Sequence, residues 1–240
     1  MTTNIPLVSI GCPVYNSEKT ISRALQSLLS QTYPNIEIII SDNSSEDRTV
    51  DICNKYVEKY NRVTLSINKS NLGINKHFKI VYKKASGKSF MWAAADDFWA
   101  PEFIKTLVDE LESKDKPGVA MSALKRENPD GSLKDIIRFN KKNNSGNLSR
   151  WKIARKLLSP RKNIHLQKYN LFIHGVFRYD ALRNVFNIEE NILNYKERAL
   201  LFLISLSHRF IYVDKIMYSI RVQSKRFKAR HPNDPYTKKK

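Results

Sequence analysis

The sequence of 240 residues lacks several features that mark common classes of protein. It has only two cysteines, Cys12 and Cys53, and both lie in apolar segments, so we expect buried free thiols in a reducing cytosol rather than a disulfide framework. No run of about 18 apolar residues occurs, so the sequence predicts no membrane-spanning helix. The first residues have neither the basic nor the apolar region of a secretion signal. These absences favour a cytoplasmic protein.

Motifs of several enzyme classes are also missing. No G-x-G-x-x-G follows the first apolar run and no G-x-x-x-x-G-K-[ST] occurs, which disfavours Rossmann dehydrogenases and P-loop ATPases. The five histidines have no metal-ligand spacing, which argues against a histidine-based zinc site. No G-x-S-x-G marks a hydrolase nucleophile. The composition itself, 41% hydrophobic and 10% aromatic, is that of a globular protein.

Positive charge is concentrated in the second half of the chain. Residues 1–120 hold 15 Lys and Arg against 14 Asp and Glu, whereas residues 121–240 hold 27 against 9. Such a basic half indicates an anionic partner: membrane lipid, a phosphorylated acceptor or nucleic acid. A solvated basic surface is the alternative. Nucleic acid is disfavoured because no zinc-finger, RNP or helix-turn-helix pattern accompanies the charge.

The first half predicts an α/β fold with a parallel sheet. Apolar runs alternate with segments of helical periodicity, and this order is typical of βαβ units. The run Ile36–Ile40 is almost continuously β-branched, as in a strand buried on both faces. The expected strands are residues 7–12, 36–40, 63–67 and 90–95, with Pro13 ending the first.

The second half is less regular. We predict a helix from Phe103 to Lys114 and a loop over residues 125–150 that contains a hairpin turn at Pro129-Asp130-Gly131. A tail dominated by Lys and Arg begins at Ser224. The other expected elements are a strand at 119–124, a basic amphipathic helix at 151–159, a strand at 171–176, a buried helix at 199–206 and closing strands at 210–213 and 216–221.

Polar side chains follow three of the predicted strands where each ends. Pro13-Val14-Tyr15-Asn16 follows the first strand, Asp42 the second, and Asp96-Asp97 the fourth. In a parallel sheet these positions share one edge, where α/β folds bind ligands. Paired carboxylates suit Mg²⁺ or Mn²⁺, and such a cation suits a diphosphate.

Each of these signals has a simpler interpretation when it stands alone. Asp42 is then a turn residue, and the Asp96-Asp97 pair is a strand end that leads into a helix N-cap. Asp42 can also accept hydrogen bonds from a base or ribose, with Tyr15 stacking or hydrogen-bonding beside it. Because the three strand ends converge, a nucleotide-diphosphate site becomes as strong an interpretation as these simpler ones.

These motifs, in order and spacing, resemble the inverting family 2 glycosyltransferases of GT-A fold over about residues 5–124. The segments that carry the resemblance are Val8-Ser9-Ile10, Pro13 to Asn16, Ser41 to Thr49, Asn71-Leu72-Gly73 and Ala95-Asp96-Asp97 with Pro101 four residues on. The resemblance implies a Rossmann-like, mostly parallel sheet flanked by helices, with a basic, irregular and helical acceptor part. Residues 1–124 would be the nucleotide-sugar-binding half, residues 125–223 the acceptor side of the same domain, and residues 224–240 a basic tail.

The resemblance also assigns roles to residues. Those implied to bind the nucleotide-sugar donor are Pro13, Tyr15, Asn16, Asp42, Asn71 and Asp96, and those implied to hold Mn²⁺ or Mg²⁺ are Asp96 and Asp97. The family pattern usually reads Asp-x-Asp-Asp, and Ala94 stands where its first acid is expected. This departure could weaken metal affinity, shift the donor preference or mark an inactive relative, although the surviving pair favours activity.

The second half resembles the family more faintly, from Glu197 through His208-Arg209-Phe210 to Tyr218-Ser219-Ile220-Arg221. Glu197 would be the catalytic base, although the family residue is usually Asp and the acid before it is Lys196 here. A first-turn glutamate that suits the helix dipole is the alternative. His174 and Arg221 are further candidates for acceptor or phosphate contact.

The expected function is therefore metal-dependent transfer of a sugar, with inversion, from a nucleotide diphosphate to an acceptor hydroxyl in polysaccharide or glycolipid assembly. The expected acceptor is a glycan or a polyprenyl-diphosphate-linked glycan at the inner face of the cytoplasmic membrane. There the Lys- and Arg-rich tail would contact anionic lipid. The alternative is a catalytically weak or inactive GT-A relative that acts as a nucleotide-binding module.

Overall fold

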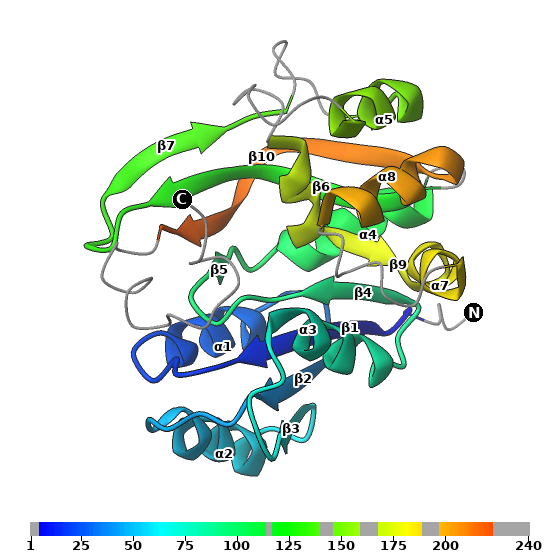
Figure 1. Ribbon diagram of the computed structural model, residues 1–240. Helices are drawn as coiled ribbons and strands as arrows, with labels where there is room; N and C mark the ends of the chain where they lie inside the picture. The colour runs from blue at the N-terminus through cyan, green and yellow to red at the C-terminus, as the bar shows by residue number, and fades with distance from the viewer. Residues whose placement is uncertain (1–4, 114–116, 140–145, 159–167, 189–196, 223–240) are drawn as a thin grey trace, which may run out of the picture.

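The computed structural model describes residues 5–113, 117–139, 146–158, 168–188 and 197–222. Its strands form one mixed sheet in the order β3-β2-β1-β4-β9-β6-β10-β5, with β7 beside β6 and β8 beside β10 (Figure 1). The strands are β1 (Val8–Val14), β2 (Ile36–Asp42), β3 (Val63–Ile67), β4 (Ser89–Trp92), β5 (Phe98–Trp99), β6 (Pro117–Glu127), β7 (Leu133–Ile137), β8 (Gly146–Leu148), β9 (Val176–Arg178) and β10 (Arg209–Arg221). The helices are α1 (Ile21–Leu29), α2 (Thr49–Lys59), α3 (Ile74–Lys83), α4 (Phe103–Ser113), α5 (Arg150–Leu158), the 3₁₀ helix η1 (Lys168–His174), α7 (Tyr179–Ile188) and α8 (Glu197–Ser207).

The first half of the sheet is parallel, as predicted. Strands β3, β2, β1 and β4 are hydrogen-bonded neighbours that run in one direction. Ile38 and Ile39 of β2 point to opposite faces of the sheet, and both are buried. The sheet is therefore covered on both faces, which explains the unbroken β-branched run in this strand.

Strand β1 extends one residue beyond Pro13, although the sequence predicted that this proline would end it. The backbone polar groups of Gly11 face β4, as its carbonyl accepts the Ala93 N–H at 2.8 Å. Pro13 lies two residues further on and faces the same side, where β4 has already ended at Trp92. Its missing N–H thus removes no ladder bond, and Val14 still pairs with Asp42 of β2.

The second half of the chain continues the same sheet. Strand β9 is antiparallel to both β4 and β6, and β10 runs parallel to β6. Strand β6 runs to Glu127 and so crosses the expected boundary at residue 124. The division of labour between the two halves stays a prediction, but their strands belong to one hydrogen-bonded sheet.

The expected loop over residues 125–150 is wrong. Strand β6 continues to Glu127, the chain turns, and β7 returns antiparallel to β6. The predicted hairpin turn is confirmed: Gly131 has φ +91° and the Asn128 N–H bonds to the Ser132 carbonyl at 2.8 Å. The sequence does not predict β7, because its apolar and polar residues do not alternate. In the structure Leu133 and Ile136 are both exposed, so no buried apolar face requires such alternation.

Two further expectations in this half are corrected. Most of the strand expected at 171–176 is η1, and β9 begins only at Val176. Gly175 separates them, because a side chain there would come within 2.3 Å of the Ala120 carbonyl oxygen. The two closing strands are the single strand β10, whose pairing with β6 shifts register between Val213 and Ile216.

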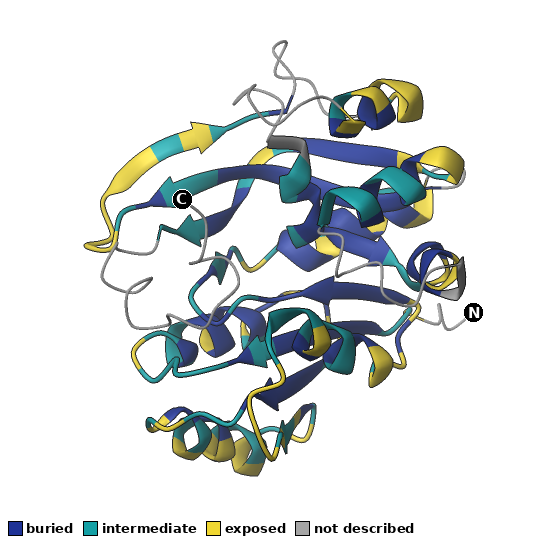
Figure 2. Cartoon of the chain, in the orientation of Figure 1, coloured by how far each residue is buried: buried dark blue, intermediate teal, exposed yellow. Residues whose placement is uncertain are grey.

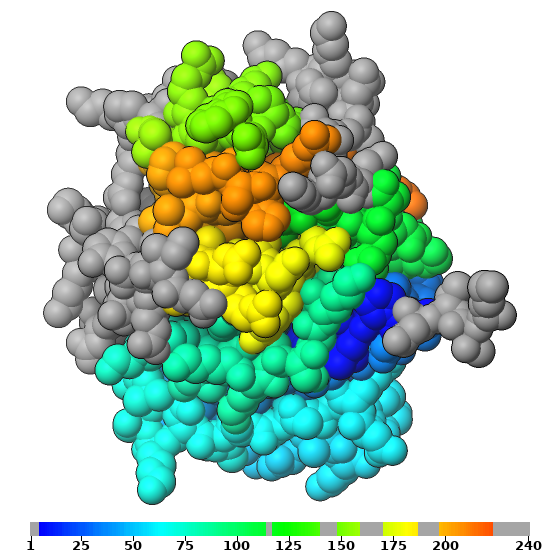
Figure 3. All heavy atoms as spheres, turned by 90° about the vertical axis from the view of Figure 1, so that its right-hand side faces the viewer, coloured from blue at the N-terminus to red at the C-terminus, as the bar shows by residue number. Residues whose placement is uncertain are grey.

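The helices expected at 151–159 and 199–206 are confirmed as α5 and α8. Both lie outside the sheet, with α5 packed on α8 and α8 on α7 (Figure 3). Helix α5 buries one side and exposes the other (Figure 2). No helix in the described ranges is long and apolar enough to cross a membrane. The expected tail at 224–240 lies outside the described residues.

Candidate functional site

The loops that carry the predicted site residues of β1, β2 and β4 begin at one edge of the sheet. Strands β2, β1 and β4 are adjacent and parallel, so their carboxyl ends lie together (Figure 1). Val14 stands opposite Asp42, and the Asn43 N–H bonds to the Val14 carbonyl at 2.9 Å. We call this place the carboxyl edge. The loops that follow β1, β2 and β4 all begin here.

Asp42 anchors the turn that follows β2. Its side chain is fully buried, and its carboxylate accepts hydrogen bonds from the Ser45 backbone N–H, at 2.8 Å, and from the Ser45 hydroxyl. The same hydroxyl accepts the Asn16 N–H at 2.9 Å, and the Asn16 side-chain oxygen accepts the Glu46 N–H at 2.9 Å. Asn16 has φ +46°, a left-handed conformation that asparagine tolerates. The turns after β1 and β2 are thereby fixed to each other.

Asn71 is held against the same turn by a residue to which the sequence gave no role. The Asn43 side-chain amide donates to the Asn71 side-chain oxygen at 2.7 Å, and the Asn43 oxygen accepts the Leu72 N–H at 3.0 Å. Asn71 also accepts the Gly73 N–H at 2.9 Å, where Gly73 has φ +78°. Asn43 therefore links the segment before α3 to the carboxyl edge. Its position directly after Asp42 is the only sequence signal for this role.

The adjacent carboxylates Asp96 and Asp97 lie in different environments. Asp97 is 3% exposed, and its two oxygens accept hydrogen bonds from the Tyr218 hydroxyl and, at 3.3 Å, from the Arg221 backbone N–H. Asp96 is half-buried, as is Ala94. Burial, and then the neighbouring charge of Asp96, raise the pKa of Asp97 well above its ordinary value. Asp96 is thus the more accessible carboxylate of the pair.

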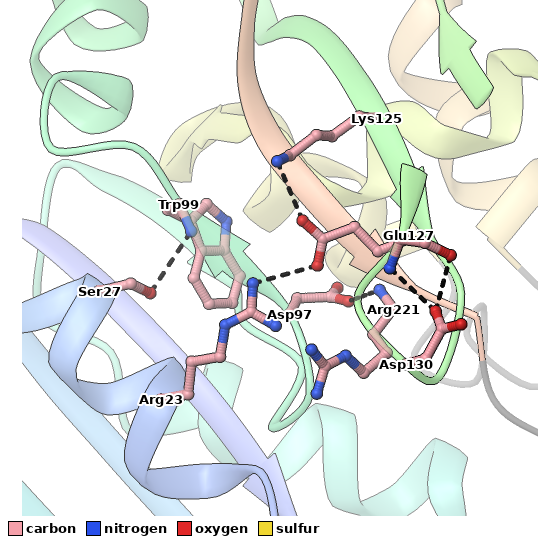
Figure 4. A network of polar contacts seen from close by, with 9 residues as sticks. Arg23, Ser27, Asp97, Trp99, Lys125, Glu127, Asp130 and Arg221 are labelled. Carbon is pink, nitrogen blue, oxygen red and sulfur yellow. Dashed lines mark hydrogen bonds and ion pairs between the residues drawn. The ribbon is translucent and has the colours of Figure 1, made fainter. Parts of the chain in front are cut away.

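A group of charged residues lies beside Asp97 at the ends of β6 and β10 (Figure 4). Buried Glu127 binds the Arg23 guanidinium at 3.1 Å and the Lys125 ammonium at 3.0 Å. Burial alone would raise the pKa of Glu127, but the hydrogen bonds from Lys125 and Arg23 outweigh it, and the pKa is lowered. Arg221 contributes a third cation, and its Nε atom is buried without a hydrogen-bond partner in the part of the chain that the structure describes. This unpaired donor fits an anionic ligand.

Glu197 begins α8 and is half-buried. Helix α8 ends at Ser207 and β10 begins at Arg209, so the chain reverses and the start of α8 lies toward the side where β10 ends (Figure 1). Arg198 fixes this start, because its guanidinium donates to the Leu157 carbonyl of α5 at 2.9 Å. Lys196, the residue before the expected base, lies outside the described residues.

His174 connects this region with the buried acid. It ends η1, which packs against α8, and its ring lies 5.5 Å from the Tyr218 ring between centroids. Burial lowers the pKa of His174 to about 4, so the imidazole is neutral at pH 7. A neutral ring packed on Tyr218 supports the position of that tyrosine more readily than it binds a phosphate.

The carboxyl edge suits a cation that is shared with a ligand. In the described ranges no three His, Cys, Asp or Glu side chains gather as a metal centre. Mg²⁺ in proteins is often held by one or two carboxylates together with substrate phosphates and water. The half-buried Asp96, next to an Asp97 that bonds the Arg221 backbone, fits that mode of binding. It does not fit a metal ion caged by protein ligands alone.

Comparison with known proteins agrees with this architecture. Residues 9–185 match the family described as glycosyl transferase family 2. The chain is 38% identical over 108 residues to the UDP-Glc:α-D-GlcNAc-diphosphoundecaprenol β-1,3-glucosyltransferase WfaP of Escherichia coli. The aligned segment covers 45% of this chain and 42% of that enzyme. The chain spans about two fifths of the length of such curated relatives.

Two solved structures show the same fold. Residues 1–349 of Staphylococcus aureus TarS, in complex with UDP, align with a TM-score of 0.70 and 23% identity, over 92% of this chain and 62% of that one. The mannosyltransferase PcManGT of Pyrobaculum calidifontis, in complex with GDP-Man and Mn²⁺, aligns with a TM-score of 0.67 and 17% identity, over 95% of this chain and 61% of that one. The predicted GT-A fold is confirmed, and the chain belongs to glycosyl transferase family 2.

Proposed function

We propose that this chain transfers a sugar from a nucleotide-diphosphate donor to an acceptor hydroxyl with inversion, in cell-surface polysaccharide or glycolipid assembly. The observation that carries the proposal is that Ser45 joins Asn16 to Asp42 at the carboxyl edge, while Asp97, the neighbour of Asp96, accepts the Arg221 backbone N–H. The Arg221 Nε has no hydrogen-bond partner among the described residues. The polar turns at the carboxyl edge, the half-buried Asp96 carboxylate and the Arg221 guanidinium together suit the parts of a nucleotide diphosphate.

The donor would lie across the turns after β1 and β2. Asp42 and Asn16 shape those turns through Ser45, and Asn71 is held against them by Asn43. Pro13 near the end of β1 and Tyr15 directly after that strand would contribute to donor binding from there. The TarS and PcManGT structures hold UDP and GDP-Man, which are ligands of this kind.

Asp96 would help to hold a divalent cation, which would supply charge stabilisation for the leaving diphosphate. The role of Asp97 as a second metal ligand stays a prediction. Both of its oxygens already have protein partners in Tyr218 and Arg221. Asp97 fastens the loop after β4 to β10 and so fixes the position of its neighbour Asp96.

Transfer needs a base near the acceptor. The Glu197 carboxylate would take the acceptor hydroxyl proton as that oxygen attacks the anomeric carbon from the face opposite the diphosphate. The bond between the anomeric carbon and the diphosphate oxygen then breaks, and its electron pair leaves with the nucleoside diphosphate. Arg221 would donate to that departing oxyanion. A polyprenyl-diphosphate-linked glycan, such as the name of the E. coli relative describes, is the acceptor class that we favour.

The test combines binding and turnover. Thermal denaturation with UDP, GDP or TDP, with and without Mn²⁺, should show stabilisation of roughly 2.7 kcal/mol at about 100 times the dissociation constant of the correct nucleotide. Nucleotide release from matching donors should then fall in Asp96→Asn and Glu197→Gln. Equal release by the wild type and both variants over a broad acceptor panel would remove the transferase proposal.

A nucleotide-binding module without transfer is the second candidate. It is favoured by Ala94, which stands where the family has an acid, and by the burial of Asp97. A metal-dependent thermal shift without turnover of any donor would select it.

A further inference from the structure

Helix α5 presents an exposed face of mixed character. Its buried residues, Ile153, Ala154 and Leu157, lie on one side. On the opposite side, Trp151 is 63% exposed and Leu158 is 66% exposed, although apolar side chains of this size are usually covered. They lie seven residues apart, two helical turns or about 10 Å along the axis. We define the α5 face as Trp151, Lys152, Arg155, Lys156 and Leu158.

The sequence in and around helix α5 carries charge of one sign. Helix α5 contains four Lys and Arg and no Asp or Glu, and residues 136–179 as a whole contain 11 Lys and Arg and no acid. An exposed tryptophan and leucine among cations are typical of a helix that lies in the interface of an anionic bilayer. A surface that binds nucleic-acid backbone has no need for exposed Leu158, or for Leu206 of neighbouring α8, which is 42% exposed.

Helix α5 is fixed to α8 at both ends. The Arg198 guanidinium donates to the Leu157 carbonyl at 2.9 Å, and the Arg150 guanidinium donates to the Leu206 carbonyl at 3.3 Å. The two helices are therefore antiparallel, and the Leu158 end of the α5 face lies at the start of α8, where Glu197 is found. A bilayer along α5 would bring lipid close to the acceptor side of the site.

We propose that the α5 face docks on an anionic lipid membrane, with Trp151 and Leu158 entering the interface and the cations facing lipid phosphates. The α5 face shares no residue with the basic tail at 224–240, which the sequence predicts as the lipid contact. The delivery of a lipid-linked acceptor toward Glu197 rests on the proposed function, whereas docking itself does not.

The chain carries a reporter for this test. Of its three tryptophans, Trp92 and Trp99 are buried and Trp151 is exposed. Vesicles of phosphatidylglycerol and phosphatidylcholine should shift the emission of Trp151 to shorter wavelength and protect it from acrylamide, and brominated lipid should quench it. Vesicles of phosphatidylcholine alone should have no such effect. The Trp151→Phe variant should lose the spectral change, because the buried tryptophans cannot respond.

Vesicle flotation at low salt then separates the α5 face from other basic surfaces. Each cation near an anionic bilayer contributes about fivefold to binding, so Lys152→Glu/Lys156→Glu should weaken binding more than tenfold. The matched control, Lys55→Glu/Lys76→Glu, makes the same change of charge on exposed positions of α2 and α3 and should weaken it much less. Thermal denaturation should show that all variants remain folded.

Three outcomes would overturn the proposal. The first is no change in Trp151 emission with anionic vesicles. The second is flotation that survives the α5 changes but is lost when the Lys and Arg of residues 224–240 are replaced by Gln. The third is binding to duplex DNA at physiological salt without a response to vesicles. Because no donor is present in these measurements, their failure would leave the proposed transfer intact, and a failed transfer assay would leave docking intact.

Discussion

The Tyr218 hydroxyl donates a hydrogen bond to the Asp97 carboxylate, and this contact joins the loop after β4 to strand β10. Both side chains are buried, and the Tyr218 ring also stacks on Trp99 with 5.6 Å between centroids. The acid that the sequence assigned to a metal is therefore also a structural fastener for its neighbour Asp96. The first prediction tests this contact directly.

Replacing Tyr218 with Phe removes the hydroxyl and leaves a buried carboxylate with one weaker partner, the Arg221 N–H. We expect the free energy of unfolding in urea to fall by about 1–3 kcal/mol. Asp97→Asn in the same background should recover part of this loss, because a neutral amide leaves no unpaired charge buried in the interior. Losses that simply add in the double variant would mean that the two residues do not stabilise each other.

The second prediction concerns pH and Glu127. The pKa of Glu127 is lowered in the folded chain, so its contribution is present above the unfolded pKa of about 4.5 and is lost as pH falls through the folded value. Since Arg23 and Lys125 are each about two fifths exposed, that contribution at neutral pH should be about 1 kcal/mol or less. In urea unfolding, Glu127→Gln should be less stable than the wild type at pH 7, and the gap should close below pH 4.

A control for this prediction is Glu102→Gln, which removes an exposed ion pair with Lys215. It should change stability less at pH 7 than Glu127→Gln does. If the gap between Glu127→Gln and the wild type widened in acid, the proposed ion pairs would be wrong.

Arg221 gives the third prediction. Its buried Nε has no hydrogen-bond partner among the described residues, so it should donate to a diphosphate oxygen, and a hydrogen bond between charged groups contributes about 1.5–3 kcal/mol. Calorimetry with the preferred nucleoside diphosphate should therefore show about 10- to 100-fold weaker binding for Arg221→Gln. Arg221→Lys should recover only part of the affinity, because it keeps the charge but lacks the Nε donor. The exposed control Arg183→Gln should bind like the wild type, and an unchanged Arg221→Gln would exclude this contact.

The sequence could predict the parallel half of the fold because each strand there is a buried apolar run between helices. It could also predict that Asp42 and Asn16 approach each other, since adjacent parallel strands end at the same edge. The sequence could not predict which residue donates a hydrogen bond to the Asp97 carboxylate. Tyr218 lies 121 residues away, and its position depends on a register shift in β10 that no local pattern reveals. Strand β7 could not be predicted for another reason. Its Leu133 and Ile136 are both exposed, so it has no buried face that would impose alternating apolar residues on the sequence.

The fourth prediction separates chemistry from binding at Glu197. A general base contributes about 10²- to 10⁴-fold to rate, so Glu197→Gln should lose that factor in nucleotide release when donor and acceptor are both present. The donor dissociation constant, measured by calorimetry, should stay the same. Glu58→Gln, an exposed change on α2, is the matched control. A parallel loss of donor affinity and rate would place Glu197 in the donor site instead.

The fifth prediction returns to Ala94, where the family usually has an acid. The residue is half-buried, and its carbonyl accepts the Asp97 N–H at 3.3 Å, so it lies within the turn that carries both carboxylates. Ala94→Asp adds a third negative charge beside Asp96, which should strengthen attraction for a divalent cation. In a titration of donor binding against Mn²⁺, the midpoint should move to lower metal concentration. Ala94→Asn, of similar size but neutral, should leave the midpoint unchanged. If the two variants behave alike, Asp96 supplies the whole metal contact of this chain, and the missing family acid has no bearing on cation affinity.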